Sequence, residues 1–364
     1  MIFSLAGWCR LSHLPEPDWS AESFAQLPND FFGINVATTE DPATDEILLG
    51  HLRELGLKHV RCDVDLPGMN GHPARLIERL QAEGFGVMVR LLQDPAATGC
   101  NPDWLQLLGA ARERFCSDSR TVDSWEIGAT PNRRKWSGYT HRSYLAAWNA
   151  AVAELHGSAP LAGPNVSDFE PPHAYALLAR MRTKPDIHTV NLFTERTRTP
   201  EAFDHRVLGR AAAPRLKLNL IKKARVFDHI SHRFGVGQTM CTHTCWNTFR
   251  LHRWVREAEP APEQSEETEA EQVEQMRSDL LERYLRLAAA SGALRRVYWG
   301  PLVGWADGLV DDGTGGVASG ERVARHLTAP GDPSDWVRRP ALDAFARVVR
   351  ERDGTVLRPE GTAD

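Results

Sequence analysis

The most telling stretch of this sequence is residues 125–132, which read Trp-Glu-Ile-Gly-Ala-Thr-Pro-Asn. β-forming and apolar residues run into a Gly and then a Pro, which is typical of a strand that ends in a turn. Three cations and an aromatic residue follow directly, in the run Arg133-Arg134-Lys135-Trp136. The stretch therefore predicts a buried strand whose end carries polar and charged side chains.

Outward from this stretch, short β-rich runs alternate with amphipathic helical runs along the chain. The predicted strands are residues 31–36, 58–63, 86–91, 121–128, 160–163, 187–193, 235–241 and 294–300. The predicted helices are residues 44–55, 73–83, 103–115, 140–155, 172–182, 213–229, 272–290 and 334–350. Eight such pairs predict an α/β protein built as a single (β/α)8 TIM barrel, in which binding residues gather at the carboxyl ends of the strands.

Three segments lie outside the alternation, and they set the domain bounds that we expect. Residues 1–30 form an N-terminal extension, residues 31–353 the barrel, and residues 354–364 a tail. The glutamate-rich residues 257–274 predict a solvated acidic loop before the seventh helix. The Gly-rich residues 311–320 lack the strand-to-helix context of a phosphate loop and predict a flexible loop over the barrel mouth.

Composition narrows the class of protein. The chain has 364 residues, 42% hydrophobic and 25% charged, which is ordinary for a soluble globular protein. Its net charge of −5 offers no electrostatic footprint for nucleic acid, and no apolar run is long enough to span a bilayer. Residues 1–10 lack the cationic start of a signal peptide. We therefore expect a cytoplasmic protein without a membrane span.

The six cysteines are scattered rather than spaced as a disulfide framework. Cys241 and Cys245 flank His243, which raises the possibility of a metal site. No second pair with zinc-like spacing follows, so the sequence favours no metal and no cofactor.

Four features, in the correct order, resemble the clan A barrel glycoside hydrolases, most closely the family 39 type encoded with polysaccharide-assembly genes. The likeness covers roughly residues 31 to 350. The features are Phe32-Gly33-Ile34-Asn35 at the end of the first strand, Val60-Arg61-Cys62-Asp63 at the second, the run 125–132 at the fourth, and Val297-Tyr298-Trp299-Gly300 followed by Gly308-Leu309-Val310-Asp311 at the eighth. The resemblance implies a barrel that binds a saccharide.

The departures from that family lie in its chemistry. The resemblance places the family's general acid at Thr130 and its nucleophile at His243, within Cys241-Thr242-His243-Thr244-Cys245-Trp246. A retaining enzyme needs two carboxyl groups about 5 to 5.5 Å apart. A hydroxyl cannot replace a carboxylic acid whose pKa is tuned for proton transfer. If both positions are aligned correctly, the usual double displacement is closed.

Other residues at the strand ends are candidates for binding. Trp246 and Trp299 predict stacking on sugar rings, with packing at the barrel rim as the alternative. His243 is either a donor or base toward a sugar or a hydrogen-bonded histidine of a polar pocket. The resemblance pairs Arg61 with the missing nucleophile, so we expect it to meet an anionic group of the ligand. The cations Arg133 and Lys135, with Asn132 and Trp136, suit an acidic or phosphorylated saccharide, and a solvated loop face is the alternative.

Other carboxylates along the chain are candidates to replace the missing pair. Glu126 faces the same side as Thr130 but deeper in the barrel, so we expect it to be buried and held by an arginine or by backbone groups. Asp168 and Glu170 follow the fifth strand and Glu195 the sixth. A pair of these three about 6.5 to 9.5 Å apart would support an inverting mechanism.

Three hypotheses follow from the sequence. The first is a glycosidase-like barrel that binds a saccharide related to bacterial surface polysaccharide but is catalytically impaired, a pseudoenzyme. The second is an active glycosidase with relocated catalytic groups. The third is a structural partner in a polysaccharide-assembly complex, contacting a basic protein through its acidic loop. Fold analogy alone does not choose among them.

Overall fold

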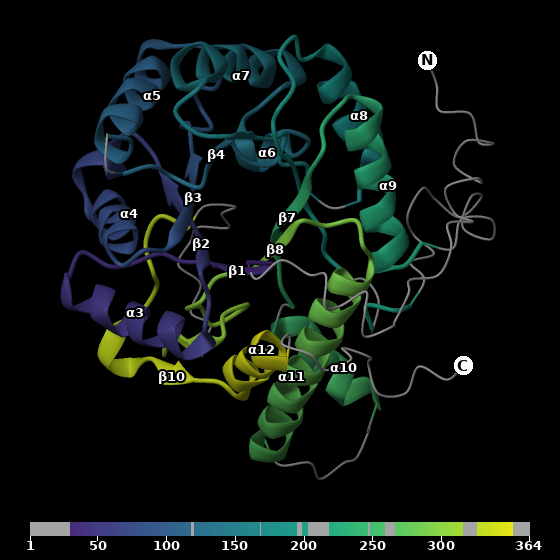
Figure 1. The fold of residues 1–364 in the computed structure, drawn as a ribbon. Coiled ribbons are helices and arrows are strands. Elements are labelled where there is room, and N and C mark those ends of the chain that lie inside the picture. Colours follow the sequence, from purple (N-terminus) through teal and green to yellow (C-terminus); the bar gives the residue numbers. More distant parts are fainter. Residues whose placement is uncertain are drawn as a thin grey trace.

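The computed structural model describes residues 30–117, 120–167, 169–194, 199–202, 218–246, 248–258, 266–315 and 326–351. Its central feature is a barrel of eight parallel strands (Figure 1). The strands are β1 (Phe32–Asn35), β2 (His59–Val64), β3 (Gly86–Leu91), β4 (Ser124–Ile127), β5 (Leu161–Ala162), β6 (His188–Asn191), β7 (Thr239–Thr244) and β8 (Arg296–Trp299). They pair in the order β5-β4-β3-β2-β1-β8-β7-β6. Bridges from Ala162 to Ile187 and from Val166 to Val190 close the barrel between β5 and β6, which confirms the predicted single (β/α)8 fold.

Helices form a ring outside the strands (Figure 1). The main ones are α3 (Ala43–Leu55), α4 (His72–Ala82), α5 (Pro102–Phe115), α7 (His141–Leu155), α8 (Pro171–Arg180), α9 (Leu220–Arg233), α11 (Glu266–Ala290) and α12 (Pro340–Glu351). Shorter elements are η1 (Pro67–Asn70), α6 (Arg134–Ser137), α10 (Thr248–Ala258), η2 (Pro333–Asp335) and the antiparallel pair β9 (Val310–Asp311) and β10 (Val337–Arg338).

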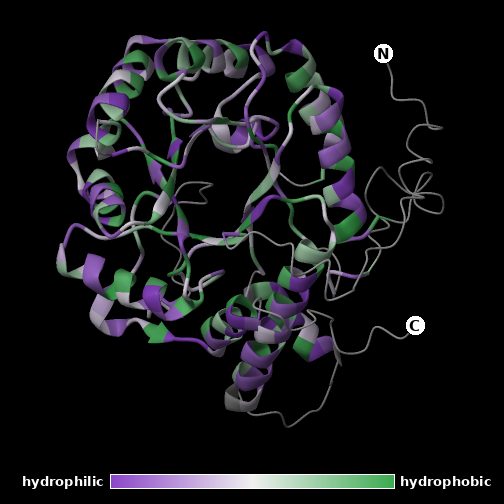
Figure 2. Cartoon of the chain, in the orientation of Figure 1, coloured by the Kyte–Doolittle hydropathy of each residue, from purple (hydrophilic) through white to green (hydrophobic). Residues whose placement is uncertain are grey.

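The sequence determines where several helices begin and which face they bury. The side chain of Asn101 accepts a hydrogen bond from the backbone of Trp104 at the start of α5, and Thr140 and Ser143 form a capping box at α7. The ring helices carry both hydrophobic and hydrophilic residues (Figure 2). The hydrophobic ones form one large core between barrel and helices, which is what an amphipathic ring around a sheet requires.

The interior of the barrel is itself packed. At the amino end of the strands Arg296 donates to Asp123 at 2.7 Å, and Arg295 donates to Asp30 at 2.8 Å. Next comes an apolar layer of Met88, Ala162, Ile187, Met240 and Tyr298. Gly33 makes room for this layer, since a Cβ there would lie 2.6 Å from the Tyr298 ring. The barrel is therefore no pore, and ligand access is restricted to the carboxyl ends of the strands.

Several predicted elements are shifted in the structure. The seventh strand was expected at residues 235–241, but β7 is Thr239–Thr244, because Gly235 adopts φ 76° and ends the preceding helix. The sixth helix was expected at residues 213–229, but α9 is Leu220–Arg233, because the Asn219 side chain accepts from the Lys222 backbone and caps it. The eighth helix was expected at residues 334–350, but α12 is Pro340–Glu351, because residues before it form η2 and the strand β10, which pairs with β9. The shift of β7 matters for the site, since it places His243 inside a strand.

The prediction of a solvated acidic loop at residues 257–274 is wrong for the part that the structure describes. Helix α10 reaches Ala258, and α11 already begins at Glu266. Glu269 accepts hydrogen bonds from Arg256 at 2.9 Å and lies 2.6 Å from His252, so α10 and α11 neutralise each other's charges. Part of the acidic surface is thus paired with basic side chains of the same chain. This pairing weakens the hypothesis that the segment docks a basic protein.

Residues 1–29 of the predicted extension, residues 354–364 of the predicted tail and residues 316–320 of the Gly-rich loop lie outside the described residues. Of the helices that are described, none combines the length and apolarity that crossing a membrane requires.

Candidate functional site

A buried ionic network lies inside the barrel at the carboxyl ends of β1 to β4. Arg61 donates through Nε to Glu126 at 2.6 Å and through Nη1 to the Asn35 side chain at 2.6 Å. Asp63 lies 3.8 Å from Arg61 and accepts from Arg90 Nε at 2.8 Å. All five side chains are almost completely buried. Two guanidinium groups face two carboxylates, so the inner mouth is charge-balanced.

The charges in this network hold one another in place. Burial works against the charge of Asp63, but Arg90 and Arg61 beside it outweigh burial and keep its pKa well below the usual range. Burial likewise opposes the charge of Arg61. The nearby carboxylates of Glu126 and Asp63 outweigh this effect and raise the pKa of Arg61. The Asp63 carboxylate therefore stays ionised and does not donate a proton near neutral pH.

This network corrects one expectation and confirms another. Arg61 was expected to lack a carboxylate partner and to meet an anionic ligand, but Glu126 occupies it. Glu126 is buried as expected, and besides Arg61 it accepts from Asn165 and from Thr242, each at 2.7 Å. Its carboxylate has therefore become a structural anchor that joins β2, β4 and β7.

His243 reaches the mouth because β7 bulges. Val190 pairs with Cys241, yet the next pair is Asn191 with His243, so β7 carries one extra residue. A bulge turns a side chain away from strict alternation and is common beside functional sites. The His243 ring stacks on His326 at 5.2 Å and lies 5.4 Å from Phe193. These three residues form the aromatic face of the mouth.

Both histidines of the aromatic face are neutral at neutral pH. Burial, the adjoining His326 and the guanidinium groups of Arg61 and Arg90 hold the pKa of His243 well below its usual value. Burial also lowers the pKa of His326 to about 4, although Asp63 opposes it. The His326 backbone donates to Asp63 at 2.7 Å, which ties this residue to β2. The face therefore offers flat, uncharged rings.

Thr130 lies at the end of β4 in a tight turn. Its carbonyl accepts from the backbone of Arg133 at 2.8 Å and from the Ser137 hydroxyl at 3.0 Å. Its φ of 38° is in the left-handed region, which costs a β-branched residue about 1 kcal/mol or more. The hydroxyl is buried, with no partner among the residues that the structure describes. A strained residue at this place is typical of a functional rim.

The stacking expected of Trp246 and Trp299 is not compatible with their positions. Both indoles are fully buried, and their rings lie 6.0 Å and 5.8 Å from Tyr284 of α11. In β8 it is Arg296 and Tyr298 that point into the barrel, so Trp299 points outward by alternation. These tryptophans pack between barrel and helices and present no ring to a sugar.

The residues predicted after β4 and β5 form a second polar cluster. Asn132 donates to Glu170 at 2.7 Å and to the Ser167 carbonyl at 2.8 Å, and Arg133 pairs with Glu170 at 3.0 Å. His173 lies 3.7 Å from Glu170. Glu170 is thus already paired, which argues against its use as a free catalytic carboxylate.

The remaining predicted residues differ in how far they can be placed. Lys135 and Trp136 are exposed on α6, Trp136 to 48%. Asp168 and Glu195 lie outside the described residues.

Sequence reasoning missed several residues that now line the mouth. The amide oxygens of Asn165 and Asn191 are buried without a hydrogen-bond partner among the described residues. Buried polar atoms are normally paired, so such atoms at a mouth favour a polar ligand. A polar Asn within the predicted sixth strand was a usable signal for Asn191. Nothing in the sequence singles out His326, which reaches the site from far along the chain.

A cavity of about 480 Å³ lies at the rim beyond β2 and β3. Among its lining residues are Asp65, Asn70, Asp94, Asn101 and Gln106.

Cys241 is buried beside Tyr284, and burial raises the pKa of its thiol to about 11. Within the described part of the chain, no three His, Cys, Asp or Glu side chains are grouped so as to hold a metal ion.

Comparison with known proteins identifies the class of fold. No protein-family model and no curated protein sequence matches this chain. Solved structures do match it, and glycoside hydrolases are among them. The chain therefore shares the (β/α)8 barrel fold of these enzymes.

Three structures illustrate the similarity. A family 39 glycoside hydrolase from Bacteroides cellulosilyticus WH2 superimposes with a TM-score of 0.60 at 14% identity, over 92% of this chain and 65% of that one. A glucosidase from Croceicoccus marinus gives 0.59 at 12%, over 89% and 68%. The family 1 β-glucosidase from Thermotoga maritima gives 0.56 at 12%, over 90% and 99%. The chain thus spans about two thirds of the length of the first two, and identities this low establish the fold alone.

Proposed function

We propose that this protein is a glycosidase-like barrel that binds an oligosaccharide at its mouth without cutting it by the usual pair of carboxylates. One observation carries the proposal. The carboxylates that the described residues supply inside the mouth, Asp63 and Glu126, are buried and neutralised by arginines. The places where the family's catalytic carboxyls are expected hold Thr130 and His243, neither of which can take over the role of a carboxylic acid.

Saccharide binding is supported by the chemistry of the mouth. Sugars combine C–H-rich faces, which pack on aromatic rings, with hydroxyls, which pair with amides. The rings of Phe193, His243 and His326 supply the first kind of contact. The unpaired amide oxygens of Asn165 and Asn191 supply acceptors for the second. Because the inner charges balance, the sugar unit held there is uncharged.

An acidic or phosphorylated ligand would be recognised farther out. Arg134 and Lys135 are exposed on α6, beside Trp136. We propose that any acidic or phosphate substituent of the polysaccharide lies against these cations, while an uncharged unit enters the mouth.

Calorimetric titration with bacterial surface oligosaccharides, together with assays on aryl glycosides, tests the proposal. We expect binding without release of new reducing ends. Phe193→Ala and Asn191→Ala should each weaken binding about tenfold or more, since each removes a contact worth about 1 to 2 kcal/mol.

Turnover at ordinary glycosidase rates would contradict the proposal. If that turnover were lost in Asp168→Asn, Glu170→Gln or Glu195→Gln, the protein would instead be an active glycosidase with relocated carboxylates. Tight binding that is unaffected by every mouth variant would place the ligand elsewhere.

A further inference from the structure

A pair of exposed aromatic side chains lies at the rim beyond β7 and β8. Phe249, on α10, is 64% exposed, more than any other large hydrophobic residue among those described. Trp305, in the loop after β8, is partly exposed. Their ring centroids are 4.7 Å apart at an interplanar angle of 64°. We name Phe249 and Trp305 the rim pair.

The rim pair is held rigidly by the backbone on both sides. The Thr248 backbone donates to the Ala306 carbonyl at 2.8 Å, and the Thr248 hydroxyl donates to the Trp305 carbonyl at 3.0 Å. The Trp305 backbone donates to Asp312 at 2.8 Å. The first two bonds join the start of α10 to the loop after β8, and the third lies within that loop. The backbone that carries the two rings is thus fixed, which reduces the entropic cost of binding a ligand.

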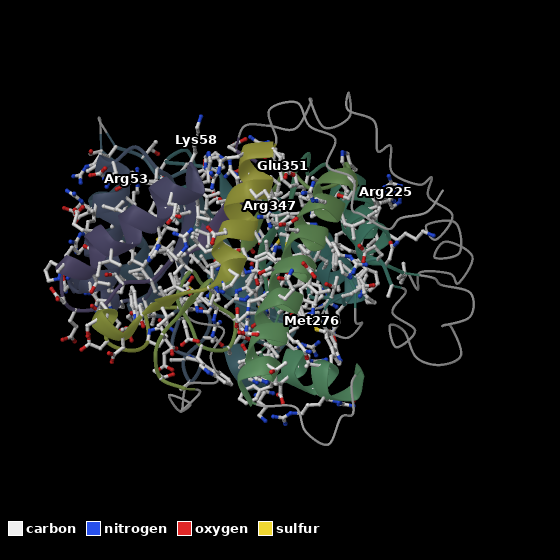
Figure 3. All side chains as sticks on the ribbon, turned by 90° about the horizontal axis from the view of Figure 1, so that it is seen from below. Arg53, Lys58, Arg225, Met276, Arg347 and Glu351 are labelled. Carbon is white, nitrogen blue, oxygen red and sulfur yellow. The ribbon has the colours of Figure 1, made fainter. Side chains whose placement is uncertain are left out.

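The rim pair lies at the end of the barrel where ligands enter. Lys58, just before β2, and Glu351, at the carboxyl end of α12, mark the opposite end, and α10 lies away from both (Figure 3). Phe249 is only five positions beyond Thr244, the last residue of β7, a reach of at most about 18 Å. An oligosaccharide seated in the mouth can therefore extend over these rings.

The surroundings of the rim pair favour a sugar over a protein partner. The neighbouring outward side chains of α10 are charged, with Arg253 paired to Glu257 at 2.7 Å and Arg256 paired to Glu269 at 2.9 Å. In the described part of this rim the surface around the two rings is thus mainly charged, and two rings offer far less apolar area than a specific protein interface buries. Two fixed rings with a polar surround suit the apolar face of one sugar ring.

We propose that Phe249 and Trp305 form an outer subsite that stacks on an uncharged hexopyranose unit of an oligosaccharide whose other end occupies the mouth. The inference rests on the proposed function and adds to it the length and charge class of the ligand. The ligand spans at least the mouth and the rim, and the unit at the rim carries no charge.

The test compares short and long uncharged probes. Three disaccharides (laminaribiose, cellobiose and chitobiose) and the three matching pentasaccharides are titrated calorimetrically into the wild-type chain and its variants. The wild-type should bind at least one pentaose more tightly than its biose. Phe249→Ala and Trp305→Ala should weaken that pentaose about three- to tenfold, as loss of one aromatic contact does, and leave the biose unchanged. Trp305→Tyr keeps an aromatic ring at this position, so it should bind the pentaose nearly as tightly as the wild-type chain does.

Two controls separate this inference from the proposed function. Leu105→Ala removes an apolar side chain of α5 that is 51% exposed, and it should change neither affinity. Asn191→Ala should weaken both probes. If Asn191→Ala does so but both rim variants bind the pentaose like wild-type, the outer subsite is refuted and the mouth site stands. If no probe binds the wild-type, both are refuted. Self-association that is lost in Phe249→Ala would assign the rings to a protein contact and overturn the subsite.

Discussion

Glu126→Gln tests whether the buried carboxylate of Glu126 is a structural anchor of the barrel. The substitution keeps the volume of the side chain and removes its charge. One amide oxygen then has to serve the donors of Arg61, Asn165 and Thr242, which two carboxylate oxygens serve now. The NH2 group would face either the guanidinium or the other donors. A buried cation therefore loses its closest counter-charge.

The structure sets the expected size of this effect. Arg61 has no exposed side-chain surface, and its next carboxylate, that of Asp63, is 3.8 Å away and already bound to Arg90. Breaking a buried ion pair by removing one partner costs about 3 to 5 kcal/mol. Since Asp63 compensates in part, we expect Glu126→Gln to lower the free energy of unfolding by about 3 kcal/mol.

Urea denaturation at pH 7, with constant protein concentration, measures this change. Glu154→Gln is the matched control, because its partner Arg112 lies on the surface at 3.3 Å, and we expect a loss of at most about 1 kcal/mol. Combining Arg61→Met with Glu126→Gln should cost less than the sum of the two single changes, since the pair acts as a unit. A loss below about 1 kcal/mol for Glu126→Gln, or strict additivity in the double variant, would refute the anchor role.

Three further predictions follow from backbone geometry, burial and exposure. A Cβ on Gly138 (φ 73°) would lie 1.9 Å from the Pro95 carbonyl oxygen, whereas one on Gly84 (φ 84°) meets nothing within 4 Å. Calorimetric melting should therefore show Gly138→Ala destabilised well beyond the roughly 1 kcal/mol expected for Gly84→Ala, and equal losses would contradict the contact. Burial lowers the pKa of His188 to about 3, so below pH 6.5 the unfolded chain takes up a proton that the folded chain refuses, and stability falls as the pH drops from 6.5 toward 3. This term amounts to about 2 kcal/mol between pH 7 and pH 5, and a His188→Asn variant with an unchanged pH slope would disprove it. Iodoacetamide mapped by peptide mass spectrometry should label exposed Cys100 before the buried cysteines of the described chain, and rapid labelling of Cys241 in the native protein would contradict its burial.

The sequence predicted the fold well because the signal for each βα unit is local. The third strand matches its predicted bounds, residues 86–91, and the helices that follow strands one to five are shifted by no more than a few residues. Apolar periodicity and caps such as Thr140 act within one turn or strand, so they can be read without knowing the rest of the chain. The burial of Glu126 could be predicted for the same reason.

The site could be predicted only in part, because side-chain direction depends on register. A bulge in β7 turns His243 into the mouth, and strict alternation in β8 turns Trp299 outward onto α11. One inserted residue reverses which face a side chain occupies. The sequence named both residues, but only the pairing of neighbouring strands determined where they point.

By itself, the sequence determined the barrel, the presence of Thr130 and His243 at the ends of two strands, and the polar character of the mouth, since these depend on residue identity and local pattern. Only the tertiary structure decided the partner of Arg61, which pairs with Glu126 across 65 positions of the chain, and the stacking of His243 on His326. Such contacts join residues that are distant in sequence, and closure of the barrel is what brings them within bonding distance.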